Sequence, residues 1–141
     1  MDATGQRRWV GAVVLLGAVY CVVGIASAQL AGGATSNQVR TMWRLTAFAS
    51  STIVFIAHVR YECLRRGNSP VVTAWHTSLA VALGAFALAA AALLHALASA
   101  SGRPGLLAIA LIAWPLLTGV PAFLVALGGA ALLRRGKHRV A

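Results

Sequence analysis

The stretch from Val71 to Ala98 is the feature that most limits what this chain can fold into. Wound as an α-helix, it sorts its side chains into two arcs. The small or polar arc consists of Thr73, His76, Thr77, Ala80, Gly84, Ala87, Ala91 and His95. The bulky arc consists of Trp75, Leu79, Phe86 and Leu93. In lipid, small residues let helices approach closely while bulky ones face the acyl chains. The stretch therefore predicts a membrane-spanning helix with a packing face, and Ala82, outside the small arc, is expected to face lipid.

The composition of the whole chain fits the same environment. Of its 141 residues, 60% are hydrophobic and only 10% are charged, and a helix needs about 20 mostly apolar residues to cross a bilayer. Segments of this kind cover residues 9–30, 42–59, 71–98 and 106–133. They occupy most of the chain, so we expect one transmembrane domain over residues 1–141. The predicted fold is an all-α, integral membrane four-helix bundle, with up-down antiparallel order because the connections are short.

The first segment has two interpretations. Residues 1–28 have the basic start, apolar middle and small-residue ending, Ala26-Ser27-Ala28, of a cleaved signal peptide. However, the apolar part from Trp9 to Ile25 is longer than the roughly 7–15 residues usual in such signals. We favour a retained membrane helix, with cleavage as the alternative.

The net charge of +10 does not predict nucleic-acid binding, because the basic residues gather at the ends of the apolar segments. There they contact lipid head groups and set the topology. One side carries nine: Arg7, Arg8, Arg60, Arg65, Arg66, Arg134, Arg135, Lys137 and Arg139. The other side carries three: Arg40, Arg44 and Arg103. The excess of positive charge on the cytoplasmic side of membrane proteins predicts that both termini are cytoplasmic, in a bacterial inner (plasma) membrane.

The scarcity of acidic residues excludes several classes of enzyme. Asp2 and Glu62 are the only two, too few for paired-carboxylate hydrolysis or a carboxylate-rich metal cage. The sequence has no phosphate-binding glycine loop and no GxSxG, HExxH or CxxC motif. Charged residues are also missing from the interiors of the apolar segments, which argues against active transport. Glu62 itself, with Arg65 and Arg66 three and four residues later, is expected in a surface ion pair.

The histidines are the remaining candidates for chemistry. His58 ends the second apolar segment and His76 lies near the start of the third, so antiparallel neighbours would bring them to similar depth. Such a pair can ligate the iron of a b-type haem, and a metal ion held by His58, His76 and Glu62 is a variant. The plainer interpretation is hydrogen bonding across helices. The same choice applies to His95, which with Arg103 would otherwise line an outer quinone or lipid site.

The expected role is therefore structural. Helix packing is predicted at Gly17, Gly24, Ser51, Ala80, Gly84, Ala87, Ala91 and Gly119. Faces of small residues pack a chain against itself, a second copy or other membrane subunits within the lipid bilayer. We expect an accessory or structural subunit with no catalysis and no cofactor of its own. The alternative is a redox anchor that binds haem or quinone through His58 and His76, and a third possibility is a small transporter or channel.

Overall fold

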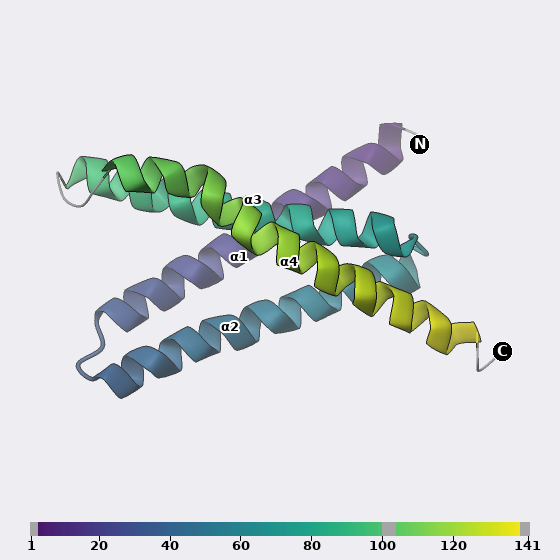
Figure 1. Cartoon of the computed structure of the whole chain (residues 1–141), viewed down its shortest axis with the longest axis horizontal. Coiled ribbons are helices and arrows are strands. Elements are labelled where there is room, and N and C mark those ends of the chain that lie inside the picture. The colour runs from purple at the N-terminus through teal and green to yellow at the C-terminus, as the bar shows by residue number, and fades with distance from the viewer. Residues whose placement is uncertain (1–2, 100–103, 139–141) are drawn as a thin grey trace.

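The structure, a computed structural model, describes residues 3–99 and 104–138, and the regular structure in that part of the chain is helical. Figure 1 shows the elements in order: α1 (Ala3–Gly32), α2 (Asn37–Arg60), the π-helical turn η1 (Tyr61–Arg65), α3 (Pro70–Ala98) and α4 (Pro104–His138). Within the described residues, four stretches are long and apolar enough to cross a membrane: Trp9–Gly32, Asn37–Arg65, Pro70–Ala98 and Gly105–Arg135. This confirms the all-helical, membrane-spanning class predicted from the sequence.

The helix α3 is the centre of the arrangement. It packs against α4 along one side and against α1 along another, whereas α2 packs mainly against α1. Figure 1 shows both marked chain ends on the same side of the molecule as the connection between α2 and α3. One hydrogen bond joins two of these parts, because Arg134 donates from Nη2 to the carbonyl of Gly67 over 2.9 Å. The end of α4 therefore lies against the α2–α3 connection.

Two helices begin earlier than predicted because serine side chains cap them. Residues 37–41, expected in a loop, form the first turn of α2, where the hydroxyl of Ser36 accepts a hydrogen bond from the Val39 amide over 3.3 Å. Ser69 does the same for the Val72 amide at the start of α3. A serine at this position satisfies an amide that the helix itself leaves unpaired. The connection between the first two helices is therefore shorter than the gap between the predicted segments 9–30 and 42–59.

The end of α2 also differs from the prediction. The helix does not give way to an irregular loop at Arg60 but widens into η1, and the amide of Arg66 bonds the carbonyl of Tyr61 over 3.2 Å. Gly67 then reverses the chain with φ +67, a left-handed conformation that glycine adopts without steric cost. The amide of Asn68 bonds back to the carbonyl of Glu62 over 3.1 Å. Wide turns of this kind often occur at functional sites.

Small residues let α3 approach both of its neighbours. A Cβ placed on Gly84 would lie 2.6 Å from the Tyr20 Cβ and 3.0 Å from the Gly17 carbonyl, so α1 and α3 nearly touch there. On the other side, a Cβ placed on Gly119 would lie 3.2 Å from the Cβ of Ala82. Ala82 therefore faces α4, and the expectation that it faces lipid was wrong. The physical reason is that α3 has two packed sides rather than one.

The last helix continues through its two prolines. Pro115 and Pro121 both lie inside α4, and Figure 1 shows the helix changing direction along its length. Proline removes one intrahelical hydrogen bond and bends a helix, which a membrane bundle tolerates.

Candidate functional site

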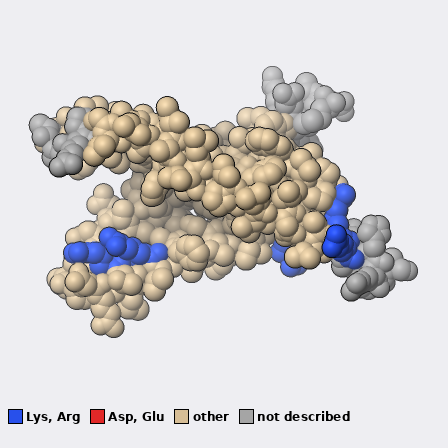
Figure 2. Space-filling view, in the orientation of Figure 1, with Lys and Arg blue, Asp and Glu red and all other residues tan. Residues whose placement is uncertain are grey.

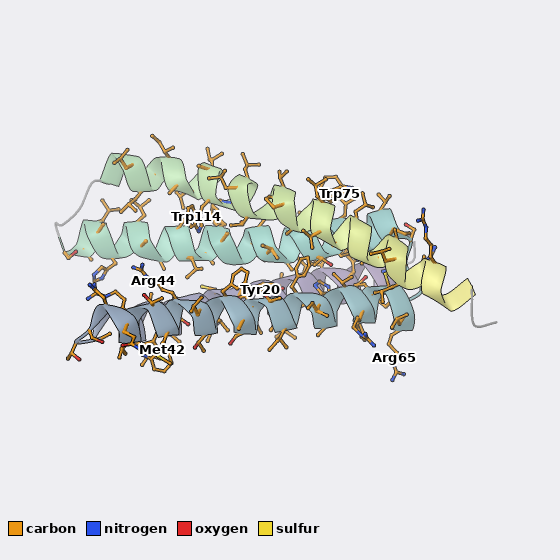
Figure 3. The ribbon with its side chains drawn as sticks, turned by 60° about the horizontal axis from the view of Figure 1, so that its bottom comes forward. Tyr20, Met42, Arg44, Arg65, Trp75 and Trp114 are labelled. Atoms are coloured by element: carbon orange, nitrogen blue, oxygen red, sulfur yellow. The ribbon has the colours of Figure 1, made fainter. Side chains whose placement is uncertain are left out.

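Glu62 is the most unusual residue of the described structure, because its side chain is only 1% exposed. The expectation that Glu62 forms an ion pair at the surface was wrong, because the side chain is buried. Arg66 does pair with the carboxylate, Nη1 to Oε1 over 3.4 Å. Arg65 forms no ion pair among the described residues, and Figure 3 shows it pointing away from the bundle. A carboxylate with so little contact with water needs hydrogen bonds and positive charge from the protein.

The carboxylate receives contacts from both of its oxygens. His76 of α3 donates from Nδ1 to Oε2 over 2.9 Å, and Asn68 of the connecting turn donates from Nδ2 to the same oxygen. Arg66 and His58 face the other oxygen, Oε1, with the Nε2 of His58 at 3.8 Å. The five residues Glu62, His58, Arg66, Asn68 and His76 form what we call the Glu62 cluster. It joins the end of α2 to the start of α3.

The cluster also includes α1 through an aromatic contact. The imidazole of His76 is stacked on the indole of Trp9, with ring centroids 4.8 Å apart and planes 3° apart. A stacked aromatic pair contributes more stabilising free energy than the burial of its apolar surface alone. One residue further along η1, the Sγ of Cys63 lies 3.6 Å from the Oγ1 of Thr73. Three helices therefore converge on a few side chains at one end of the bundle.

His58 takes part without a hydrogen bond. It is 4% exposed, and neither ring nitrogen has a hydrogen-bond partner among the described residues. The 3.8 Å that separates Nε2 from Glu62 is too long for a direct hydrogen bond but suits an ion pair when the imidazole is protonated. His58 also lines an apolar groove of about 430 Å³ between α1 and α2, together with residues such as Ala12, Leu16 and Val54.

The geometry does not favour haem between the two histidines. The structure brings His58 and His76 together, as adjacency of α2 and α3 required, but both contact the carboxylate of Glu62. An iron atom bound by both ring nitrogens would have to lie where that carboxylate lies. For the metal variant with Glu62, no group of three or more His, Cys, Asp or Glu side chains in the described residues has an arrangement that could hold an ion.

His95 lies at the far end of α3 from the Glu62 cluster and is exposed. Its carbonyl accepts hydrogen bonds from the amide and hydroxyl of Ser99, over 3.0 and 2.7 Å. Arg103, its expected companion, lies outside the described residues. The side chain of His95 forms no hydrogen bond or ion pair with other residues in the described part of the chain.

Most of the predicted packing residues lie where two helices meet. Gly17 faces Leu83, and Gly24 faces Leu88, so these glycines of α1 receive leucines of α3. Ala80 is fully buried in a cluster with Val13 and Tyr20. The remaining residues are Gly84 and Gly119, already described, the half-buried Ala87 and Ala91 of α3, and Ser51, which lines a cavity.

The basic side chains gather at opposite ends of the molecule, as Figure 2 shows for one face. At one end, Arg40 and Arg44 of α2 line a groove of about 550 Å³ beside α1, and Arg40 donates from Nε to the carbonyl of Ala31 over 3.3 Å. At the other end lie Arg60, Arg65, Arg66, Arg134 and Arg135. The side chains of Arg7, Arg8, Arg103, Lys137 and Arg139 lie outside the described residues.

Sequence reasoning missed two residues of this site: Asn68, a member of the Glu62 cluster, and Trp9, which is stacked on His76. A signal for the burial of Glu62 did exist, because Ala47, Ser51, Val54 and His58 form a stripe that Glu62 continues at helical spacing. A scan against protein-family models finds no match to this chain, and searches of curated proteins and of solved structures find none either.

Proposed function

We propose that this chain is a multi-pass inner-membrane protein with a structural or accessory role, which packs against other membrane subunits or further copies of itself and catalyses no reaction. The observation that carries the proposal is the Glu62 cluster. Both oxygens of Glu62, the one acidic side chain in the described residues, are engaged by groups from α2, the α2–α3 connection and α3. A carboxylate that is paired on both oxygens within the bundle links the ends of the helices, which is a structural role.

A second reason to assign the cluster a structural role is that it links several helices. Through the stacking of Trp9 on His76 it reaches α1 as well as α3, and these two helices also pack through small residues such as Gly17 and Gly84. Membrane helices associate through close packing and interhelical hydrogen bonds, since lipid gives no hydrophobic driving force between them. The polar residues of the bundle thus support its assembly.

We further infer that the helices cross the bilayer in alternating directions, with both termini in the cytoplasm. Support comes from the charge count, nine basic residues against three. The hydrogen bond from Arg134 to Gly67 also supports it, because it joins two segments assigned to the cytoplasmic side. The Glu62 cluster then lies at the cytoplasmic ends of the spans, where Arg66 reaches the head-group region.

The test is a mass measurement on the protein extracted from its own membrane. The full chain, 14.5 kDa by sequence, is isolated in mild detergent and examined by native mass spectrometry, with an absorption spectrum of the same sample. We expect a colourless assembly of constant composition that is heavier than the monomer. A monodisperse monomer, or one carrying a haem band, would contradict the proposal.

A further inference from the structure

Two arginines of α2 border the groove of about 550 Å³ at the end of the molecule where α1 is connected to α2. Arg40 and Arg44 are about one helical turn apart, so their side chains share a face of α2. The opposite wall consists of small residues of α1: Gly24, Ser27, Ala28, Ala31 and Gly32. Figure 2 shows basic side chains at this end along the edge of a hollow. In Figure 3, Arg44 lies on the side of α2 that faces α3, whereas Met42 points away from it. The two guanidinium groups therefore belong to one groove.

No carboxylate of the described residues neutralises either guanidinium group. Arg40 donates from Nε to the carbonyl of Ala31, and its Nη groups have no partner in the described part of the chain. Arg44 forms no hydrogen bond or ion pair with any described residue. Glu62, the one acidic side chain in the described structure, is buried within its own cluster at the other end of α2. Like charges one helical turn apart repel each other, so an anion bound between the two arginines would stabilise them.

The groove continues into an apolar cavity of about 470 Å³ deeper in the bundle, and Gly24 lines both spaces. All four helices contribute to the walls of the cavity, and the described residues that line it carry no charge. Phe48 and Trp114 are among them and are exposed, so the cavity opens sideways toward the lipid. The charged groove and the apolar cavity therefore form one continuous space that an amphipathic molecule can fill.

The hydroxyl groups along this space complete a gradient of polarity. Ser27 lines the groove and Ser51 lines the cavity, and neither hydroxyl forms a hydrogen bond with a described residue. The two threonines of the cavity, Thr52 and Thr118, donate to carbonyls of their own helices. From the end of the molecule inward, the order is guanidinium groups, free hydroxyls and apolar walls. A phospholipid has the same order of phosphate, ester oxygens and acyl chains.

We propose that the groove and the cavity together bind one anionic phospholipid, with its phosphate between Arg40 and Arg44 and an acyl chain in the cavity. Arginine binds phosphate oxygens through paired N–H donors, and basic pockets between membrane helices bind anionic head groups. Free phosphate would leave the apolar cavity unfilled, and hydrocarbon alone would leave the charges unpaired. A second copy of the chain offers no accessible carboxylate from its described residues, because Glu62 is buried. The site is separate from the Glu62 cluster, so it stands whether or not the proposed structural role is correct.

The experiment titrates the purified full-length protein in mild detergent with phosphatidylglycerol and counts the bound lipids by native mass spectrometry. Phosphatidylcholine with the same acyl chains, which has no net charge, is the comparison probe. We expect one phosphatidylglycerol per chain, bound more tightly than phosphatidylcholine. Arg44→Gln should raise Kd for phosphatidylglycerol about 5- to 10-fold, the effect of one charge near a lipid head group. Arg65→Gln is the matched control, because it removes the same charge from an exposed position at the other end of the molecule and should leave Kd unchanged.

A second variant tests the place of the acyl chain independently. Ala122→Phe puts a ring into the cavity that Ala122 lines, and it should weaken phosphatidylglycerol binding several-fold while the protein keeps its helical circular dichroism spectrum. Four results would overturn the proposal: equal Kd for the two lipids, equal loss of affinity in Arg44→Gln and Arg65→Gln, unchanged Kd in Ala122→Phe, or displacement of phosphatidylglycerol by inorganic phosphate at equal concentration. The last result would identify a site for a free anion.

Discussion

The imidazole of His76 lies flat on the indole of Trp9 while its Nδ1 donates to Glu62, so one histidine side chain joins α1, η1 and α3. Stacking fixes the plane of the ring, and the hydrogen bond fixes its rotation within that plane. The two contacts therefore reinforce each other. The following predictions test this arrangement and the packing around it.

The stacked pair should be energetically coupled. In a double-mutant cycle of Trp9→Leu and His76→Leu, we expect a coupling energy of about 0.5–1.5 kcal/mol in the free energy of unfolding. Unfolding of the detergent-solubilised protein by heat or denaturant measures it. The control cycle combines His76→Leu with Trp75→Leu, because Trp75 neighbours His76 in sequence but contacts Phe123 of α4. Equal coupling in the two cycles would contradict the stacking.

Neutralising the buried carboxylate should destabilise the bundle. Glu62→Gln keeps the shape of the side chain but removes the charge that faces Arg66 and His76, and it should lower the free energy of unfolding by about 1–3 kcal/mol. The same measurement on Arg65→Gln should show a change within about 0.5 kcal/mol, as expected for an exposed position. If the two variants were equally stable, Glu62 would be no more than a surface residue.

A methyl group at Gly84 should push α1 and α3 apart. Its Cβ would lie 2.6 Å from the Cβ of Tyr20 and 3.0 Å from the Gly17 carbonyl, neither of which can rotate away. We expect Gly84→Ala to lower the free energy of unfolding by about 1–3 kcal/mol through overpacking. Gly128→Ala is the matched control, since nothing lies within 4 Å of its added methyl, and it should stabilise the helix by about 0.5–1 kcal/mol. Comparable loss in both variants would place the contact elsewhere.

The inferred topology can be tested by labelling introduced cysteines. Cys63 is buried and unsuitable, so Cys21→Ser and Cys63→Ser form the background for Arg65→Cys and Gln38→Cys at two exposed positions on opposite sides. In intact cells, a membrane-impermeant maleimide should label the cysteine at position 38 and spare that at position 65 until the membrane is opened. The reverse pattern would invert the orientation.

The sequence predicted the membrane helices well because their cause is local. A long apolar segment has no stable alternative to a helix in lipid, since every backbone amide must be bonded within the segment. The ends of the helices were less predictable, because they depend on single side chains such as Ser36 and on the widening at Tyr61–Arg65. A serine in a polar segment is compatible with either a loop or a cap.

The candidate sites were less accessible to sequence reasoning because they depend on which helices meet. The charge pattern of Glu62 and Arg66 is the same on an exposed helix as on a buried one, and only the contact with α3 distinguishes them. Ala82 was misplaced because a single packing arc was assumed for α3, although Ala74, Ser78, Ala85 and Ala89 form a second buried set. The burial of the Tyr20 hydroxyl likewise depends on how the helices pack, which no local pattern encodes.

The position of the Glu62 partners along the chain has a consequence for how the protein enters the membrane. Asn68, Arg66 and His76 all follow Glu62 within the hairpin of α2 and α3, and no residue of α4 contributes a contact to the carboxylate in the described structure. During synthesis, the residues that pair with the Glu62 carboxylate therefore emerge soon after it, in the connection and at the start of α3. An unpaired carboxylate would oppose insertion of α2 into lipid. Within the hairpin of α2 and α3, the carboxylate is already paired with Arg66 and His76. The fourth helix then joins a hairpin whose most polar residue is already neutralised.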